Sequence, residues 1–168
     1  MKFSLSREAL LKPLQLVIGV VERRQTLPIL SNVLFSLSDK NLSITGTDLE
    51  VEIVGLTAVS TSEEEGSVTI SARKTLDICR SLPEGATLKF SSSEGKASIQ
   101  SGKSKFMLST LPASEFPTVD EGEKSLEFSV SGKDLQKLIE STSFAMAQQD
   151  VRYLSLIHIS EPTRRAII

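Results

Sequence analysis

The 168-residue chain has no tryptophan, one cysteine, one histidine and only 5% aromatic residues. Because Cys79 is the single cysteine, no internal disulfide can form, and this favours a reducing compartment and predicts a cytoplasmic protein. The N-terminus carries charges at Lys2, Arg7 and Glu8 and so lacks the apolar core of a signal peptide. No run of about 18 apolar residues occurs, so we expect no membrane span.

The sequence motifs of common enzymes are also missing. There is no glycine-rich phosphate loop and neither a CxxC nor an HExxH spacing. The only histidine, His158, lies in a C-terminal segment of doubtful origin, which leaves no nucleophile and base pair. Asp48, Glu50 and Glu52 alternate along a strand-like run, a pattern typical of the solvent face of a sheet rather than of a Mg²⁺ site. We therefore expect a binding or assembly protein, not an enzyme, with no metal or cofactor.

The composition that is present indicates a folded chain whose charges are segregated. Hydrophobic residues make up 39% and charged residues 24% of the chain, with a net charge of -2. The acidic runs 63–65 and 120–123 lie in loop-like stretches, whereas the basic pairs 23–24 and 73–74 lie on or beside predicted helices. Each basic pair alone is also explained by a solvated helix face. A mildly acidic total therefore does not exclude a nucleic-acid partner.

A pattern of one strand followed by one amphipathic helix occurs three times. Phe3, Val68 and Phe128 take the same place in each copy, and the second and third follow the first by 65 and 125 residues. Such spacing indicates a repeated supersecondary unit. Strand-like runs fill the intervals, with turn signals at 39–41 and 94–96. The expected fold class is α+β, with helices on one face of an antiparallel sheet.

Serine residues are placed to begin the three helices. Ser6 and Ser71 precede the first two helices as N-caps, and Ser131 forms a capping box with Asp134. Pro13 falls inside the first helix and should kink it or delay its regular part, because proline removes a backbone hydrogen bond.

Seven strings, in order, resemble one family between Met1 and Tyr153. They are "MKF", "LLKPLQ", "TLPIL", "GTDLE", "ARKTLDICRSLPEGA", "LSTLPASEFP" and "FAMAQQDVRY". The chain thereby resembles the bacterial replicative sliding clamp, the β subunit of DNA polymerase III. The resemblance implies a DNA-clamp fold with two strand-helix-strands repeats per domain, three domains per protomer, and a ring of two protomers joined head to tail.

The resemblance also implies a function and a set of partners. Such a ring encircles double-stranded DNA, slides on it through phosphate contacts without reading sequence, and tethers the replicative polymerase after a clamp loader has placed it. The protein would then be a DNA polymerase processivity factor with no reaction of its own. An independent α+β binding module that does not assemble into a ring is the alternative.

Particular residues match positions with known roles in that family. The matches that imply DNA contact are Arg24, Arg73, Gln149 and Tyr153, and helix placement adds Arg7, Lys12 and Arg80 as further DNA-facing candidates, although simple solvation explains those three equally well. The matches that imply the ring interface are Lys74, Lys103, Lys105, Phe106 and Leu108, with Phe106 and Leu108 on one face of an edge strand. Phe106 could equally be a core residue. Arg152 matches the rim of the pocket that receives partner peptides.

The chain is expected to consist of three parts. Residues 1–124 form a complete first clamp domain, and residues 125–153 begin a second domain that is cut off. Residues 154–168 start with "LSLIHISEPTR", which resembles the translation of a transposase adaptor used in sequencing libraries. We therefore expect this tail to be non-native and the fragment to be unable to close a ring. We also expect the second part to be loosely packed, since it lacks a sheet to cover the apolar stripe of its helix.

Overall fold

The computed structural model describes residues 1–21, 27–93, 95–118 and 129–144. The chain divides into two units, Met1–Asp120 and Glu121–Ile168. None of the helices in these described ranges is both long enough and apolar enough to cross a bilayer.

The first unit contains two copies of a strand, a helix and a three-stranded meander. The first copy consists of β1 (Lys2–Ser6), α1 (Arg7–Val17), the 3-10 helices η1 (Ile18–Val20) and η2 (Pro28–Ser31), β2 (Asn32–Ser38), β3 (Asn41–Thr47) and β4 (Glu52–Ala58), followed by the short β5 (Thr61–Glu64). The second copy consists of β6 (Gly66–Ser71), α2 (Ala72–Ser81), β7 (Thr87–Ser93), β8 (Lys96–Ser101), β9 (Ser104–Leu111) and the 3-10 helix η3 (Ala113–Glu115).

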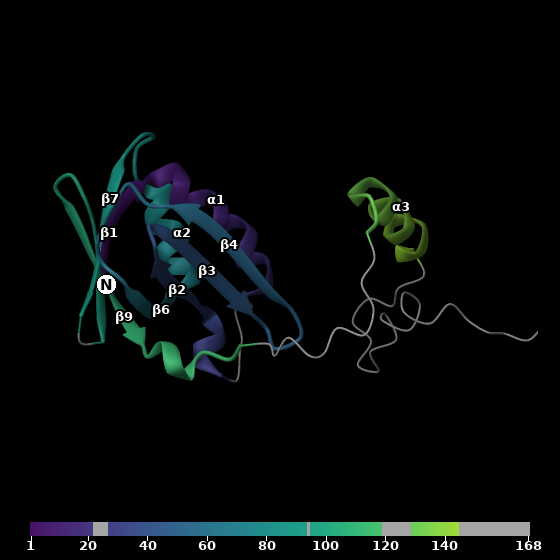
Figure 1. Ribbon diagram of the computed structural model, residues 1–168, viewed down its shortest axis with the longest axis horizontal. Helices are drawn as coiled ribbons and strands as arrows, with labels where there is room; N and C mark the ends of the chain where they lie inside the picture. The colour runs from purple at the N-terminus through teal and green to yellow at the C-terminus, as the bar shows by residue number, and fades with distance from the viewer. Residues whose placement is uncertain (22–26, 94, 119–128, 145–168) are drawn as a thin grey trace, which may run out of the picture. The chain divides into compact units, whose positions relative to one another are not determined.

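The strands form one antiparallel sheet in which the two copies exchange their first strands (Figure 1). The order of the described strands is β4-β3-β2-β6-β9-β8-β7-β1-β5. β1 pairs along its length with β7 of the second copy, where Phe3 lies opposite Phe90. β6 pairs in the same way with β2 of the first copy, where Val68 lies opposite Phe35. Neither copy can therefore complete its own sheet without the other.

One hydrophobic core joins the two copies. Phe3 and Val68, which hold equivalent places in the repeat, both lie in this core, with 3% and 8% of their surface exposed. The Phe90 ring stacks on Phe3 at a centroid distance of 4.8 Å and meets the Phe35 ring at 5.7 Å. Phe90 thus links the strand pair β1–β7 to β2 through aromatic contacts, which add to the hydrophobic burial.

Helix α1 lies close against β3 and β4, and glycine permits the approach. A Cβ atom built on Gly55 of β4 would lie 2.6 Å from Cβ of Pro13, and one on Gly46 of β3 would lie 2.5 Å from Cγ1 of Val17. Helix α1 continues without interruption past Pro13, which is buried. The absence of side chains at these two glycines therefore sets the distance between helix and sheet.

The structure confirms the turn at 39–41 and the N-cap of α1 that the sequence predicted, but not the cap of α2. Asp39 and Lys40 both have positive φ, 48° and 63°, in the two-residue turn between β2 and β3, as a type I′ hairpin requires. The Ser6 hydroxyl accepts the Ala9 N–H at 3.2 Å and caps α1. Ser71 occupies the N-cap position of α2 but makes no side-chain capping bond.

Two acidic segments differ from the sequence-based expectation. Asp48 and Glu50 lie in the turn between β3 and β4, where Asp48 Oδ1 accepts the N–H groups of Glu50 at 3.0 Å and Val51 at 2.7 Å. An aspartate that bonds to the backbone two residues on stabilises a turn, so local hydrogen bonding prevailed over the alternating pattern. Glu63 and Glu64 lie in β5, paired with β1, rather than in a loop.

The described part of the second unit contains helix α3 (Gly132–Ser143). The predicted capping box is confirmed, because the Ser131 hydroxyl accepts the Asp134 N–H at 3.1 Å and donates to its carboxylate at 2.6 Å. Val130 lies outside any strand, and Phe128 lies outside the described residues, so the third strand of the repeat is not seen. The apolar side chains Leu135, Leu138 and Ile139 are 46%, 63% and 44% exposed.

Candidate nucleic-acid interface and strand edges

Helices α1 and α2 lie side by side and bury their apolar faces in the common core (Figure 1). Leu10, Leu14 and Val17 of α1 and Leu76 and Cys79 of α2 are buried. Because the apolar stripe of each helix faces the sheet, the polar residues of both helices are left on the outer side.

Cations predominate on this outer helical surface. The exposed basic residues of the two helices are Lys12, Arg73, Lys74 and Arg80, and the exposed acidic residues are Glu8 and Asp77. Among the described residues, none of these four cations has an ion-pair partner. Unpaired lysine and arginine side chains on a helix surface are suited to exchangeable contacts with phosphates, which carry no sequence information.

Arg7 and Glu8 instead connect α1 to the second copy. The Arg7 side chain is 14% exposed, and its Nε donates to the backbone carbonyl of Cys79 at 2.7 Å. The Glu8 carboxylate accepts the Gly85 N–H at 3.0 Å, and this hydrogen bond lowers the pKa of Glu8. Burial raises the pKa of the Cys79 thiol to about 11, so the thiol stays protonated. A DNA-facing role for Arg7 stays a prediction, and the contact that the structure shows is a brace between α1 and α2.

The residues matched to a ring interface lie on and beside β9. From Ser104 to Ser109 this strand pairs with β8 alone, and it pairs with β6 only at Thr110 and Leu111. The strand therefore has one unpaired edge over most of its length, as expected of an edge strand. Only its last two residues pair on both sides. Phe106 packs against the core and Leu108 is 8% exposed within it.

The basic members of that set lie around the open edge. Lys74 and Leu108 line the same depression, of about 350 Å³, between the start of α2 and β9. Lys105 is exposed on β9, and Lys103 is exposed in the turn that precedes it. The structure thus places the five residues along one strand and the adjacent helix end, and their role in assembly stays a prediction.

Four predicted site residues and the histidine lie outside the described residues. They are Arg24, Gln149, Arg152, Tyr153 and His158.

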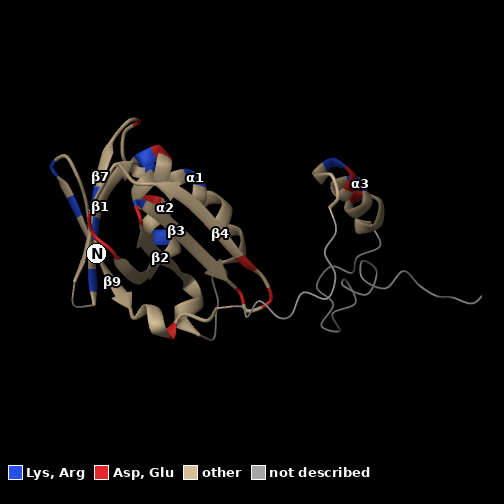
Figure 2. Cartoon of the chain, in the orientation of Figure 1, with Lys and Arg blue, Asp and Glu red and all other residues tan. Residues whose placement is uncertain are grey.

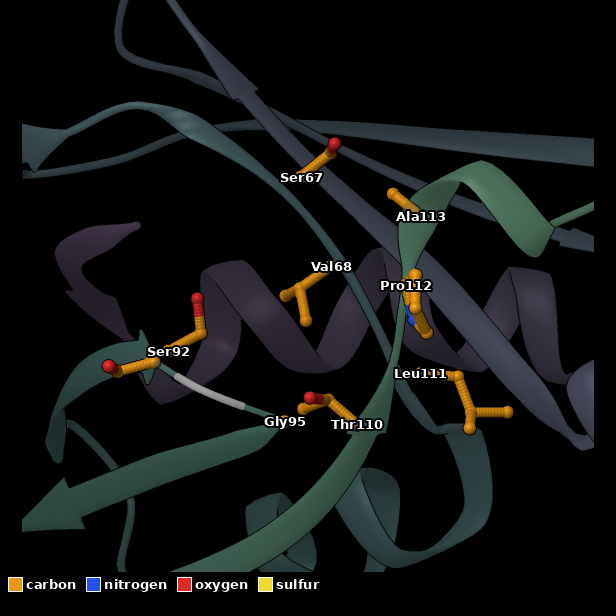
Figure 3. Close-up of a pocket in the computed structure, with 9 residues that line it drawn as sticks. Ser67, Val68, Ser92, Gly95, Thr110, Leu111, Pro112 and Ala113 are labelled. Carbon is orange, nitrogen blue, oxygen red and sulfur yellow. The ribbon is translucent and has the colours of Figure 1, made fainter.

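A second depression lies where β6 and β9 diverge beyond their short pairing. It measures about 300 Å³ and is surrounded by Ser67 and Val68 of β6, Ser92 of β7, and Thr110 and the following residues of β9 (Figure 3). The described residues that line it include no charged side chain. In the same described ranges, no cluster of three or more His, Cys, Asp or Glu residues could hold a metal.

A comparison with models of known protein families shows the family to which this chain belongs. The family model for the N-terminal domain of the DNA polymerase III beta subunit matches residues 1–120. The chain belongs to the DNA polymerase III beta subunit family. Its first unit, as seen in the structure, coincides with the extent of that match.

Relatives with the name "Beta sliding clamp" support this membership. The chain is 54% identical over 170 residues to the protein from Pseudomonas aeruginosa, covering 99% of this chain and 46% of the relative. It is 49% identical over 153 residues to that from Escherichia coli K12, covering 91% of this chain and 42% of the relative. The chain therefore spans less than half the length of these beta clamps.

Solved structures of beta subunits share the fold. The crystal structure of the DNA polymerase III subunit beta from Pseudomonas aeruginosa has a TM-score of 0.85 at 56% identity and covers 91% of this chain and 41% of that one. The Caulobacter crescentus pol III beta has a TM-score of 0.86 at 39% identity with the same coverage. The predicted α+β DNA-clamp fold is confirmed.

Sequence reasoning missed two features of this beta-subunit domain. Nothing in the pattern marked Arg7 and Glu8 as a brace, because their partners are backbone groups about 70 residues away. The exposed apolar residues of the strand edges, Val54, Leu56 and Met107, were also missed. Strand alternation could have indicated Met107, since its neighbours Phe106 and Leu108 point to the other face.

Proposed function

We propose that this chain is part of a processivity clamp for a DNA polymerase. The whole protein would form a ring of two protomers around double-stranded DNA and slide along it while it tethers the replicative polymerase. The membership in the beta subunit family supports this proposal, and the relatives are named beta sliding clamps. A place in the bacterial cytoplasm, where the chromosome lies, follows from the proposal.

The observation that carries the DNA contact is the helix pair with its unpaired cations. Lys12, Arg73 and Arg80 are exposed on adjacent helices and have no ion-pair partner among the described residues (Figure 2). The acidic side chains of Glu63 and Glu64 lie on the terminal strand β5 and not on a helix. A positive helical face would attract the DNA backbone, while acidic strands elsewhere would keep DNA from the rest of the surface.

The other site residues take their proposed roles from the same family. Arg24, Gln149 and Tyr153 would add DNA contacts, and Arg152 would lie at the rim of a pocket for polymerase and clamp-loader peptides. Lys74, Lys103, Lys105, Phe106 and Leu108 would form one side of the joint between protomers. A clamp that works by encirclement requires no catalytic group, which agrees with a role as a non-enzymatic factor.

Duplex binding by the chain tests the helix surface. We would measure fluorescence anisotropy of labelled duplexes of two unrelated sequences over a range of salt concentrations. Arg73→Ala and Arg80→Ala should each weaken binding equally for both duplexes and reduce the salt slope by about 1. Lys89→Ala is the matched control, because Lys89 is exposed on β7 and not on a helix. An equal loss for Lys89→Ala would count against the helix surface as the binding site.

Retention on circular DNA tests the ring. The whole protein, loaded with a clamp loader, should stay on a nicked circular plasmid and leave it when the plasmid is linearised. Retention that does not change on linearisation would show ordinary binding instead of encirclement.

A further inference from the structure

Three lysines lie on the face of the sheet that is turned away from the core. Lys2, Lys89 and Lys96 are exposed on β1, β7 and β8, and the residue that follows each of them is buried. Because side chains alternate along a strand, the three lysines point away from the core and its helices. β8, β7 and β1 are consecutive strands of the sheet, so the lysines share one continuous surface, the lysine face (Figure 2).

The cross-strand neighbours of two of these lysines do not neutralise them. Lys89 lies opposite Ser4 on one side and Gln100 on the other, and Lys96 lies opposite a serine on both sides. The strands β1, β7 and β8 contain no aspartate or glutamate. Opposite charges across neighbouring strands stabilise a sheet, and these two lysines lack such a partner within it.

Lys2 does have an acidic neighbour, but that carboxylate pairs with another group. Glu64 of β5 lies opposite Lys2, and its Oε2 lies 3.3 Å from the amine of Met1. Among the described residues, Lys2, Lys89 and Lys96 form no ion pair. The lysine face therefore keeps its positive charge.

A third depression, of about 390 Å³, lies between two of the lysines. Its lining includes Lys2, Ser4, Thr61, Glu63, Lys89 and Ser91. The small hydroxyl side chains leave open space beside the long lysines. Lys2 lies opposite Ser91 and so diagonally across from Lys89, at a separation of about 7–8 Å. A side chain that enters the depression can reach both ammonium groups.

Acidic residues limit the lysine face on the side of β5. Glu63 lines the depression, and Glu63, Glu64 and Glu65 are all exposed. A long nucleic-acid strand crossing the face would bring its phosphates against these carboxylates. The strands β1, β7 and β8 also offer no exposed aromatic side chain on which a base could stack, since Phe3 and Phe90 are buried. The face therefore fits a short acidic segment better than a nucleic acid.

We propose that the lysine face binds an extended acidic segment of a partner protein, with aspartate or glutamate at alternate positions. Alternate side chains of an extended chain are about 6.6–6.8 Å apart, which is close to the diagonal separation of Lys2 and Lys89. Two such carboxylates pair with these lysines at the depression, and a further one pairs with Lys96. The surface is separate from the helix pair and from β9, so the inference does not rest on the proposed function.

Chemical-shift mapping of the full chain by NMR tests the proposal. The probe is a synthetic peptide of alternating glutamate and threonine, and the control peptide has glutamine in place of glutamate. The glutamate peptide should shift the amides of β1, β7 and β8, with an affinity that falls as salt is added. The glutamine peptide should leave them unshifted. Equal shifts with both peptides, or shifts confined to α1 and α2, would overturn the proposal.

Single substitutions identify the residues that bind the glutamate peptide. Lys89→Gln should weaken binding about two- to fivefold, as expected for loss of an exposed ion pair, and Lys89→Arg should preserve it. Glu63→Gln should strengthen binding, because it removes a repulsive charge from the depression. Lys40→Gln is the matched control, since Lys40 is exposed in the turn between β2 and β3. Equal weakening by Lys40→Gln would reduce the effect to net charge and overturn the proposal.

Duplex DNA separates a peptide site from a nucleic-acid site. Added to the same labelled chain, a duplex should leave the amides around the depression unshifted, and Lys89→Gln should not change its affinity. This result, together with shifts from the glutamate peptide, supports the proposal. If the duplex shifts those amides and Lys89→Gln weakens its binding as much as that of the peptide, the face is a nucleic-acid site and the proposal fails.

Discussion

Helices α1 and α3 begin with the same local chemistry but differ in how their apolar faces are covered. Ser6 caps α1 and Ser131 caps α3, each by accepting the N–H of the residue three positions later. The apolar side chains Leu10 and Leu14 of α1 are 2% and 0% exposed, whereas Leu138 of α3 is 63% exposed. A cap and a helical period thus suffice to start a helix, but burial of its apolar face requires a sheet to pack on, which α1 has in β3 and β4.

Hydrogen exchange should show the largest difference between the two helices. Core amides of α1, such as those of Leu14 and Val17, are released only by opening much of the first unit. They should exchange at least about 1,000 times more slowly than unprotected amides, given the usual stability of a domain. Amides in the middle of α3 should lack this protection. Equal protection of α3 in exchange measured by NMR or mass spectrometry would contradict the comparison.

Truncation of a large apolar side chain should change the free energy of unfolding much more in the first unit than in the second. Phe90→Ala removes the ring that contacts Phe3 and Phe35, and it should lower the free energy of unfolding by about 3–5 kcal/mol. Leu138→Ala removes an exposed side chain, and it should change that free energy by less than about 0.5 kcal/mol. Urea denaturation followed by circular dichroism measures both. A similar loss for the two variants would mean that α3 is buried in solution.

The close contact of α1 with the sheet predicts an intermediate effect. Gly55→Ala places a methyl group against Pro13 and should destabilise the first unit by about 1–3 kcal/mol through overpacking. Gly19→Ala is the matched control, since a Cβ atom there meets nothing within 4 Å, and it should be nearly neutral. Thermal unfolding of both variants tests this, and a neutral Gly55→Ala would show that helix and sheet can separate without cost.

The helix caps predict the smallest effects. Ser6→Ala removes a hydrogen bond to the Ala9 N–H and should lower stability by about 1 kcal/mol. Ser71→Ala should have little effect, because the Ser71 side chain caps nothing. Ser131→Ala should reduce the helical content of α3, seen by circular dichroism at 222 nm, with no change in the midpoint of unfolding of the first unit. A loss for Ser71→Ala equal to that of Ser6→Ala would contradict this ranking.

Local features of this fold were readable in the sequence where neighbouring residues cause them. The turn at Asp39 and Lys40 and the caps at Ser6 and Ser131 each depend on residues within a few positions. The prediction was wrong at Asp48, where the side-chain carboxylate accepts the Val51 N–H and turns the chain within a strand-like pattern. For the candidate site, helix placement suggested Lys12 and Arg80 and the family resemblance suggested Arg73, and the structure has all three side chains exposed. Arg7 differed because its partner is a carbonyl of α2.

The sequence by itself determined the strand-helix repeat, the start of each helix, the turns and the family, because these follow from periodicity, short-range hydrogen bonds and ordered strings of residues. Only the tertiary structure decided that β1 joins β7 and β6 joins β2, and that β4 and β9 are left with open edges. The two meanders offer similar alternating apolar faces, so the pattern of residues does not choose between them. Long-range packing favours the observed pairing, since the Phe90 ring of β7 contacts two strands of the other copy, β1 through Phe3 and β2 through Phe35.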